Sequence, residues 1–152
     1  MLTLAMSVLD SRDRFEFALE KATELGITRF VPLLAKRSQH HRVHADRLVA
    51  KAVAAITQCG VAWLPEIAPA VGVEDLPRAN VVIVGDDTGD IPAALQHGTE
   101  SILVVVGPEG DLTPEEKSYL HNTLQAHRWA IGQNRLRAET AAIALLSNVV
   151  CR

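Results

Sequence analysis

The sequence predicts an α/β fold, a mostly parallel sheet with helices on both faces. Short apolar segments alternate along the chain with longer segments of helical periodicity. The apolar segments show little alternation with polar residues, which is typical of strands buried on both faces. The segments between them are long enough for the crossover connections that parallel strands need.

Length and composition fit one packed domain. The 152 residues are a usual size for a single domain, and a hydrophobic fraction of 48% supports a sizeable core. We therefore expect a single domain over residues 1–152. The longest apolar runs are shorter than the roughly 18 residues that span a bilayer, so we expect no membrane partner.

Charge and cysteine content narrow the possible functions. A net charge of −3 argues against binding nucleic acid by bulk electrostatics, so an RNA partner would have to meet a local basic patch. One such patch contains Lys36, Arg37, Arg42 and Arg47. Two cysteines do not make a disulfide framework, and we expect a reduced, cytoplasmic location.

The chain begins with a predicted strand and helix. Residues 2–9 are apolar and lack the basic start of a signal peptide, so we interpret them as the first strand. A helix is expected over 12–25, capped by Asp10 or Ser11 and ended by Gly26. Its apolar positions follow the spacing of one buried face, namely Phe15, Ala18, Leu19, Ala22 and Leu25.

A second strand and helix follow. Residues 28–34 predict a strand in which Pro32 suits a strand end or a bulge. Residues 45–59 predict a helix that Gly60 closes. The apolar face of this helix consists of Leu48, Ala52, Ala55, Ile56 and Cys59.

The middle of the chain is less regular. A short helical turn is expected at 73–76, and the uniformly apolar residues 80–84 predict the third strand. Residues 91–97 suit a brief turn or helix, and 101–106 predict the fourth strand.

The last part predicts helix, strand, helix. Thr113 suits an N-cap with Glu116 as its capping-box partner, so a helix is expected over 114–125. Residues 129–132 predict a fifth short strand, and a largely buried helix is expected from Ala138 onward. Its apolar positions are Ala141, Ala142, Ile143, Leu145, Leu146, Val149 and Val150.

Three expected strands end in loops of a type that binds ligands. These loops cover 85–90, 107–111 and 132–140. Parallel strands place their carboxyl ends at one edge of the sheet, so the three loops can converge on one crevice. None of them matches the dinucleotide-binding or P-loop glycine pattern, and no nucleophile-elbow motif is present.

Several polar residues have both a functional and a structural interpretation. Arg137 suits an anionic or developing negative group, with Glu139 near a helix N-terminus, or the two form an ordinary exposed pair. The histidine group His40, His41 and His44 suggests a metal site, but without carboxylate or cysteine partners a solvated or RNA-facing loop is the better interpretation.

Cys59 has no candidate base nearby. We therefore interpret it as a helix-face core residue rather than as a nucleophile.

Segments over nearly the whole chain fit together as one pattern, namely Phe15-Glu16, Thr23-Glu24-Leu25-Gly26, Pro32-Leu33, Lys36-Arg37-Ser38, Gln58-Cys59-Gly60, Pro65-Glu66-Ile67, Val106-Gly107-Pro108-Glu109-Gly110 with Glu116, and Leu136-Arg137-Ala138-Glu139-Thr140-Ala141. With these segments the chain resembles the SPOUT superfamily of RNA methyltransferases, and most closely the ribosomal RNA small-subunit methyltransferase E family. The Gly-Pro-Glu-Gly segment alone is a weak signal, but together with the last segment at this separation it is specific.

The resemblance implies a function and an assembly. That family makes N3-methyluridine in 16S ribosomal RNA with S-adenosylmethionine as methyl donor. It also implies a C-terminal trefoil knot and a homodimer in which the second subunit completes the cofactor site. The cofactor-binding residues that it implies are Gly85, Gly107, Pro108, Glu109, Gly110, Ile131, Gly132, Leu136, Arg137 and Thr140.

The catalytic residues that we expect are Arg137, Glu139 and Arg37. Arg137, or the partner subunit's Arg37, would stabilise the uracil oxygens as the base becomes anionic. Glu109 or Glu139 would orient the cofactor or the base. The sequence does not identify the group that takes the imide proton.

The chain departs from the family pattern at several positions. Asp111 replaces a usual second glycine, Ala138 a usual threonine, and Val61 a common arginine. Family members also carry an N-terminal PUA-like RNA-binding domain, which we expect this chain to lack. The alternative is therefore a degenerate SPOUT-fold module that binds cofactor or dimerises without methylating RNA.

Overall fold

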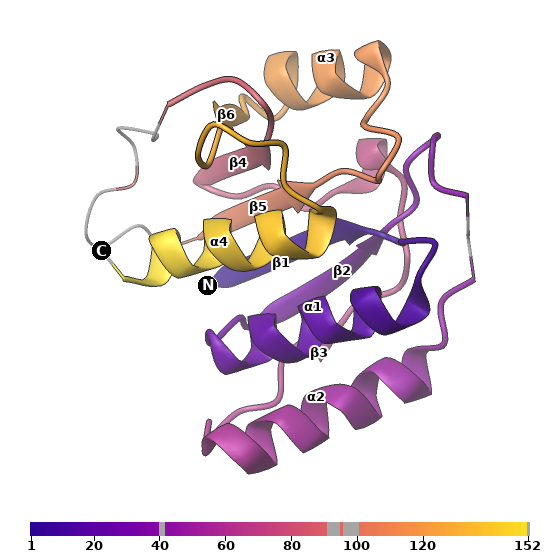
Figure 1. Ribbon diagram of the computed structural model, residues 1–152, viewed down its shortest axis with the longest axis vertical. Helices are drawn as coiled ribbons and strands as arrows, with labels where there is room; N and C mark the ends of the chain where they lie inside the picture. Colours follow the sequence, from indigo (N-terminus) through magenta and orange to yellow (C-terminus); the bar gives the residue numbers. More distant parts are fainter. Residues whose placement is uncertain (40–41, 91–94, 96–100, 152) are drawn as a thin grey trace.

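The computed structural model describes residues 1–39, 42–90, 95 and 101–151 (Figure 1). Its strands are β1 (Leu2–Ser7), β2 (Arg29–Leu33), β3 (Glu66–Ile67), β4 (Val81–Gly85), β5 (Ile102–Val106) and β6 (His127–Trp129). Its helices are α1 (Arg12–Glu24), α2 (Ala45–Cys59), α3 (Pro114–Asn122) and α4 (Ala138–Val150), with a 3₁₀ turn η1 (Val73–Asp75). No helix in this part of the chain is long and apolar enough to cross a membrane.

The six strands form one sheet in the order β3-β2-β1-β5-β4-β6, and every neighbouring pair is parallel. From β1 the chain moves outward to β2 and β3, and then returns to the other side of β1 to form β4, β5 and β6. The order therefore reverses between β1 and β5. Ligands of open α/β sheets bind at such a switch point, outside the carboxyl ends of the strands.

Helices cover both faces of the sheet, as predicted. α1, α2 and α4 pack on one face, and α3 with η1 packs on the other (Figure 1). β5 shows how the sequence produces this, because alternate residues of a strand point to opposite faces. Val104 and Val106 pack into the first layer, and Leu103 and Val105 into the second, all at most 3% exposed.

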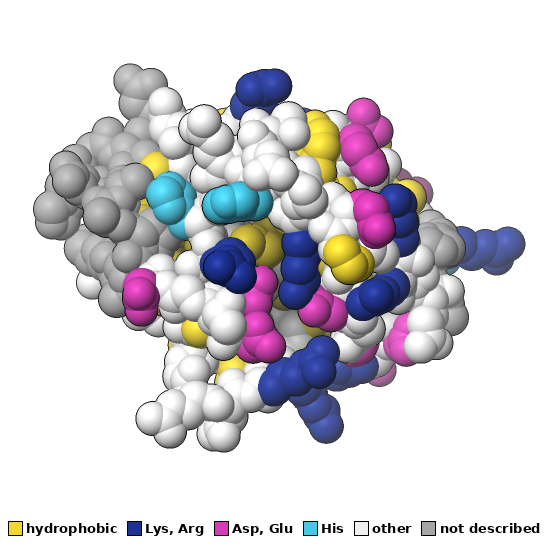
Figure 2. Space-filling model, turned by 90° about the horizontal axis from the view of Figure 1, so that it is seen from above, with side chains coloured by type: hydrophobic (Ala, Val, Ile, Leu, Met, Phe, Trp, Pro, Cys, Tyr) yellow, Lys and Arg dark blue, Asp and Glu magenta, His cyan; other side chains and the backbone are white. Residues whose placement is uncertain are grey.

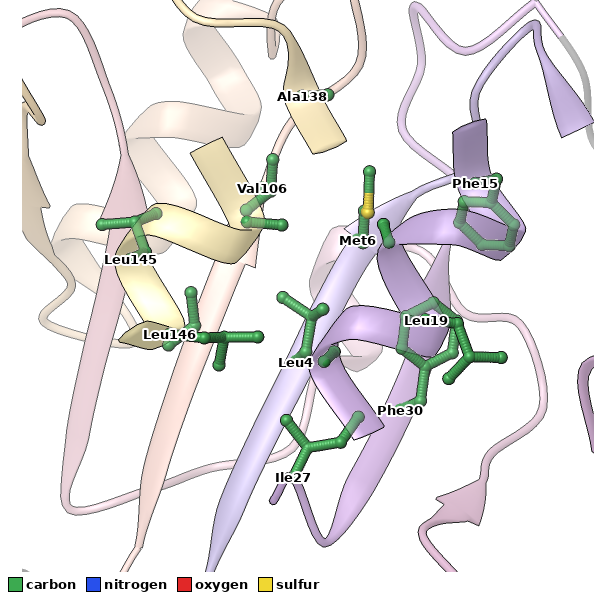
Figure 3. Packing of buried hydrophobic residues seen from close by; sticks show 14 of the residues in the cluster. Leu4, Met6, Phe15, Leu19, Ile27, Phe30, Val106, Ala138, Leu145 and Leu146 are labelled. Atoms are coloured by element: carbon green, nitrogen blue, oxygen red, sulfur yellow. The ribbon is translucent and has the colours of Figure 1, made fainter. Parts of the chain in front are cut away.

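The larger core lies between the sheet and helices α1 and α4 (Figure 3). Leu145 and Leu146 of α4 lie on one side of Leu4 of β1, and Leu19 of α1 lies on the other side. The rings of Phe15 and Phe30 meet edge to face with centroids 5.5 Å apart. The helical spacing of apolar residues therefore identified core positions in both helices, with the correction that Val150 at the end of α4 is 46% exposed rather than buried.

Pro32 lies inside β2 without costing a ladder hydrogen bond. The backbone polar groups of Leu33 point toward β1, since its carbonyl accepts a hydrogen bond from Val8 N–H (3.0 Å). Pro32 therefore faces the other side, where its carbonyl accepts from Val71 N–H (3.1 Å). β3 has already ended at Ile67 on that side, so the missing N–H of Pro32 faces no strand partner.

Three expectations about individual elements need correction or lie outside the description. Cys59 is exposed rather than a core residue. It lies at the end of α2, where residues 57–59 and the C-cap Gly60 are all exposed. The fifth predicted strand, 129–132, is β6 at His127–Trp129, whose polar residues lie on an edge strand paired with β4. The turn expected at 91–97 falls largely outside the described residues, and the trefoil knot stays a prediction.

Candidate functional site

A cleft of about 430 Å³ lies at the carboxyl edge of the sheet, on the β5, β4 and β6 side. The loops after these three strands and the first turn of α4 form its walls. Eight of the residues expected to bind cofactor line it, namely Gly85, Gly107, Pro108, Glu109, Ile131, Gly132, Leu136 and Arg137. The three loops thus converge as predicted, which is a consequence of the parallel strands that precede them.

Four other expected site residues lie outside the walls of the cleft. Gly110 follows Glu109 in the same loop, and Thr140 is exposed on the first turn of α4. Arg37 contacts the Gly110 carbonyl through Nη1 at 3.2 Å. Glu139 is 8% exposed and lies in the first turn of α4, next to Ala138, which lines the cleft.

The loop after β4 is fixed against β6. Gly89 has a φ of +110°, and a Cβ there would lie 2.2 Å from the carbonyl oxygen of Arg128. Only glycine fits this close approach of two backbones. Asp86 N–H donates to the Trp129 carbonyl (3.3 Å), and Ala130 N–H donates to the Gly89 carbonyl (3.3 Å). The two loops therefore form one wall of the cleft together.

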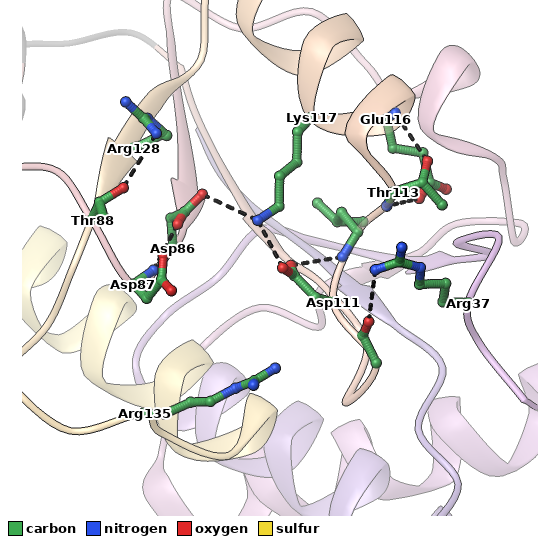
Figure 4. A network of polar contacts seen from close by, with 12 residues as sticks. Arg37, Asp86, Asp87, Thr88, Asp111, Thr113, Glu116, Lys117, Arg128 and Arg135 are labelled. Carbon is green, nitrogen blue, oxygen red and sulfur yellow. Dashed lines mark hydrogen bonds and ion pairs between the residues drawn. The ribbon is translucent and has the colours of Figure 1, made fainter.

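Lys117 joins this wall to the loop after β5 (Figure 4). Its Nζ lies 2.8 Å from Asp111 Oδ2 and 3.6 Å from Asp86 Oδ2. The hydrogen bond to Asp111 raises the pKa of Lys117. All three side chains line the cleft. The ammonium group thus holds two strand-end loops together at the edge of the site.

Asp86 and Asp87 place a carboxylate pair on the same rim. Burial raises the pKa of Asp86, but hydrogen bonding to Asp87 and the charge of Lys117 outweigh it, so that pKa lies below its ordinary value. The pKa of Asp87 is raised, chiefly by its hydrogen bond to Asp86. The rim therefore carries negative charge at neutral pH and can accept hydrogen bonds from a cationic or hydroxyl-bearing ligand.

Asp111 occupies a backbone conformation that normally favours glycine. Its φ is +66°, in the left-handed region. Asp111 Oδ1 accepts a hydrogen bond from Leu112 N–H (2.7 Å), and Oδ2 accepts one from Lys117 (2.8 Å). These contacts stabilise the turn, so the departure from the glycine of the family pattern is compatible with the shape of this loop.

Glu116 anchors the basic loop that carries Arg37 beside this site (Figure 4). Thr113 and Glu116 form the predicted capping box at the start of α3. The second carboxylate oxygen of Glu116 accepts the backbone N–H of Lys36 at 2.8 Å. Because Glu116 is 2% exposed, this hydrogen bond is well shielded from water, and it fixes the loop next to Gly110.

Arg14 is a contact residue that the sequence reasoning missed. From the first turn of α1, its Nη2 lies 2.9 Å from Glu109 Oε1 and its Nη1 lies 3.3 Å from Glu139 Oε2. Glu139 therefore pairs with Arg14 and does not form an exposed pair with Arg137. The one available signal was an acidic residue at a buried helical position, which needs a cation from elsewhere in the fold.

Arg137 lines the cleft and has no competing partner among the described residues. It is exposed at the N-cap of α4, lines the cleft, and makes no side-chain hydrogen bond or ion pair with another described residue. The positive end of the α4 dipole lies beside it. The cleft near Arg137 therefore suits an anionic group, whereas Asp86 and Asp87 suit a cationic or hydroxyl-bearing one.

The histidine group gives no support for a metal centre. His40 and His41 lie outside the described residues, and His44 is the N-cap of α2. Within the described ranges, no three His, Cys, Asp or Glu side chains are placed to hold a metal ion.

Surface charge agrees with the composition. Seen from the side of α3 and β6, Lys and Arg side chains lie interspersed with Asp and Glu side chains (Figure 2). This visible face therefore has no broad field of one sign. The chemistry of the cleft therefore depends on the charged groups that line it, among them Arg137, Asp86 and Asp87.

Comparisons with known proteins connect this architecture to a family. The family model of the RNA methyltransferase domain matches residues 1–150 of this chain. The chain is 29% identical over 155 residues to the ribosomal RNA small subunit methyltransferase E of Rickettsia conorii, covering 97% of this chain and 63% of that protein.

Solved structures show the same relationship. A ribosomal RNA small subunit methyltransferase E from Neisseria gonorrhoeae, bound to S-adenosyl methionine, is 27% identical with a TM-score of 0.84, over 97% of this chain and 64% of that chain. The SpoU methyltransferase AviRb from Streptomyces viridochromogenes shares the fold, with a TM-score of 0.65 at 16% identity over 99% of this chain and 60% of that chain. The chain thus spans less than two thirds of the length of these relatives.

Proposed function

Because the chain belongs to the RNA methyltransferase domain family, we propose that it transfers a methyl group from S-adenosylmethionine to N3 of a uridine in 16S ribosomal RNA. The proposal is supported by the relatives named above and by the convergence of three strand-end loops on one cleft. It includes action in the cytoplasm and a C-terminal trefoil knot, as in the resembled family.

The cleft fits the proposed cofactor in size and in polarity. Its volume of about 430 Å³ lies within the range of small-molecule sites. S-adenosylmethionine carries a flat adenine base, a ribose, and an amino acid end with an ammonium group and a carboxylate group. The apolar residues Val106, Ile131 and Leu136 line the cleft together with the rim carboxylates and Arg137. A zwitterionic ligand with an aromatic base matches this distribution.

Particular residues are assigned to hold the cofactor. The glycine-bearing segments 107–110 and 131–132 let backbone groups approach an adenosine closely. Asp86 and Asp87 suit the ribose hydroxyls or the ammonium group, and Arg137 with the α4 N-terminus suits a carboxylate or an anionic base. When bound, the cofactor supplies an electrophilic methyl group on a sulfonium.

The protein's own part in the reaction is to orient the acceptor and stabilise its charge. The N3 proton of uridine must leave as the nitrogen reacts, and negative charge then spreads to the uracil oxygens. A guanidinium without a competing partner beside the cleft stabilises that charge. Arg137 has this position, and Arg37 lies next to Gly110 at the same edge. Arg14 holds the Glu109 side chain, which lines the cleft, and the Glu139 side chain in place through its two ion pairs.

The proposed assembly is a homodimer. α1 and α4 lie side by side on one face of the sheet (Figure 1), and each exposes a large apolar side chain, Phe17 at 46% and Val150 at 46%. These side chains support an interface in which a second copy covers the α1 and α4 surface. Sedimentation of the purified chain tests it, and a monomer at all accessible concentrations would remove this part of the proposal.

A methylation assay tests the reaction. Small-subunit ribosomal RNA is incubated with the chain and S-adenosylmethionine, digested to nucleosides, and analysed by mass spectrometry. We expect N3-methyluridine with the parent and with the matched control Arg78→Ala, which removes an exposed arginine before β4 at the opposite edge of the sheet. Arg137→Ala should reduce the yield at least about tenfold, in line with loss of one charge-stabilising group.

The other outcomes are equally informative. A different methylated nucleoside would overturn the N3 assignment. Cofactor binding without methyl transfer to any ribosomal RNA would favour the degenerate module instead. An Arg137→Ala variant as active as the parent would remove Arg137 from its assigned role.

A further inference from the structure

A second cavity, of about 320 Å³, lies beside the first turns of α1 and α2. Its inner wall is apolar, formed by Val8, Leu9, Phe15 and Leu48, none more than 5% exposed. Basic side chains stand at its rim, among them Arg12 and Arg42, both exposed. The cavity thus combines an apolar inner wall with exposed guanidinium groups, and it shares no lining residue with the cleft described above.

One of the three acidic side chains that line the cavity, Glu16, is already paired with cations. Glu16, at 3% exposed, accepts hydrogen bonds from Nε and Nη2 of Arg47. Lys51 Nζ lies 3.8 Å from the same carboxylate and Arg12 Nε lies 3.9 Å from it. Arg42, in contrast, has no side-chain hydrogen bond or ion pair with a described residue. Its charge is therefore available to a ligand.

The charge balance indicates what kind of ligand fits. The lining residues balance, with three cations (Arg12, Arg42, Arg47) and three carboxylates (Asp10, Asp13, Glu16), and Lys51, which lies 3.8 Å from Glu16 outside the lining, adds one positive charge. His44 completes the rim. So small a surplus does not hold a free phosphate against water. A ligand must also gain from burying an apolar surface, as a nucleobase joined to a phosphate does.

The cavity lies next to the cleft along the same edge of the sheet. The cavity opens where β1 ends, and the cleft opens where β5 ends, and β1 and β5 are paired neighbours. Neighbouring strands lie about 4.8 Å apart. α4, α1 and α2 all begin at this edge (Figure 1), and the Arg14–Glu109 ion pair joins α1 to the loop after β5. A single strand lying along the edge would pass from the cleft directly to the cavity.

We propose that this cavity holds one nucleotide of the substrate RNA, near the nucleotide that is methylated. The base lies against Phe15 and its apolar neighbours, and the phosphate lies between Arg42 and Arg12. This inference rests on the proposed function. Stacked or apolar contact with a base, together with a cation at its phosphate, is the usual way in which proteins bind single-stranded RNA.

Fluorescence anisotropy tests the proposal with two labelled probes, hexauridylate and an abasic hexamer that has the same phosphates without bases. We expect the parent to bind hexauridylate at least about fivefold more tightly than the abasic strand. Val43→Trp, which fills the cavity from its partly exposed wall, should abolish that preference. Arg42→Ala should weaken hexauridylate binding several-fold and lower the slope of log affinity against log salt by about 0.7. The control Arg78→Ala should behave like the parent.

Three results would overturn the inference: no binding of hexauridylate, equal binding of both probes, or variants at Val43 and Arg42 that match Arg78→Ala. If inorganic phosphate competes with hexauridylate as effectively as uridine monophosphate does, the cavity is a simple anion site, and this result would also overturn the inference. Calorimetric titration of the same proteins with S-adenosylmethionine separates the two proposals. If the parent does not bind S-adenosylmethionine, the result counts against the proposed function. If the parent binds S-adenosylmethionine but does not prefer hexauridylate over the abasic strand, the result counts against the cavity proposal alone.

Discussion

Replacing Glu116 with alanine tests how the loop that carries Arg37 is held beside the cleft. The Glu116 carboxylate accepts the backbone N–H groups of Thr113 and Lys36, both at 2.8 Å. Alanine removes both acceptors at once. The N–H of Lys36 then loses its partner in a place where the removed side chain was 2% exposed.

The expected cost follows from the two hydrogen bonds. Loss of a helix cap costs about 1 kcal/mol, and a hydrogen bond to a charged group contributes about 1.5–3 kcal/mol. The carboxylate no longer has to be desolvated, which offsets part of the loss. We expect Glu116→Ala to lower the free energy of unfolding by about 3 kcal/mol. Thr113→Ala, which loses the bond from Glu116 N–H to Thr113 Oγ1 (3.2 Å), should cost about 1 kcal/mol.

Urea unfolding followed by circular dichroism measures both variants. With a slope of about 2 kcal/mol per molar urea, the midpoint should fall by about 1.5 M for Glu116→Ala and about 0.5 M for Thr113→Ala. Equal shifts for the two variants would refute the reasoning, because the hydrogen bond to Lys36 would then contribute nothing. Glu116 would in that case be a cap residue and not the anchor of the basic loop.

Three further predictions concern the polar contacts around the cleft. Arg14→Ala should weaken the binding of S-adenosylmethionine about three- to tenfold, because the Glu109 side chain loses its ion pair. The affinity of Arg14→Lys should lie between those of the parent and Arg14→Ala. Equal affinities of the parent and Arg14→Ala in calorimetry would contradict this prediction. Asp111→Ala should lower the urea midpoint more than Asp111→Gly, because a φ of +66° costs an ordinary L-residue about 1–2 kcal/mol and glycine nothing; the reverse order would contradict it. The pKa of Lys117 is raised by Asp111, so its stabilising effect is complete below the ordinary value of 10.5 and is lost as pH rises through the raised pKa. The difference in free energy of unfolding between the parent and Lys117→Met should therefore narrow as the pH rises through the raised pKa of Lys117. A difference that stays constant over this range would count against the ion pair.

The fold could be predicted from the sequence where local signals and burial agree. β5 is uniformly apolar and buried on both faces, and Thr113 with Glu116 forms the expected capping box. The convergence of three loops followed from a parallel sheet alone. β6 was misplaced because His127 and Arg128 are polar and exposed, so this edge strand has no apolar pattern to identify it.

The contacts that complete the site could not be predicted, because they join residues far apart in the chain. Arg14 meets Glu109 and Glu139 across separations of 95 and 125 residues. Glu116 reaches Lys36 across 80 residues. No local pattern records such pairs, and they depend on α1, α3 and α4 packing at one edge. Cys59 shows the opposite error, since helical spacing indicates a face but not whether a neighbour covers its last turn.

Calorimetric titration of the chain with S-adenosylmethionine tests the central claim most directly, namely that the three strand-end loops form its binding site. Ile131→Trp serves as the cleft-filling variant, since Ile131 lines the cleft and is partly exposed. The account predicts one saturable site per chain in the parent and in Arg78→Ala, and loss of that site in Ile131→Trp. Absence of binding in the parent, or unchanged binding in a folded Ile131→Trp variant, would contradict it.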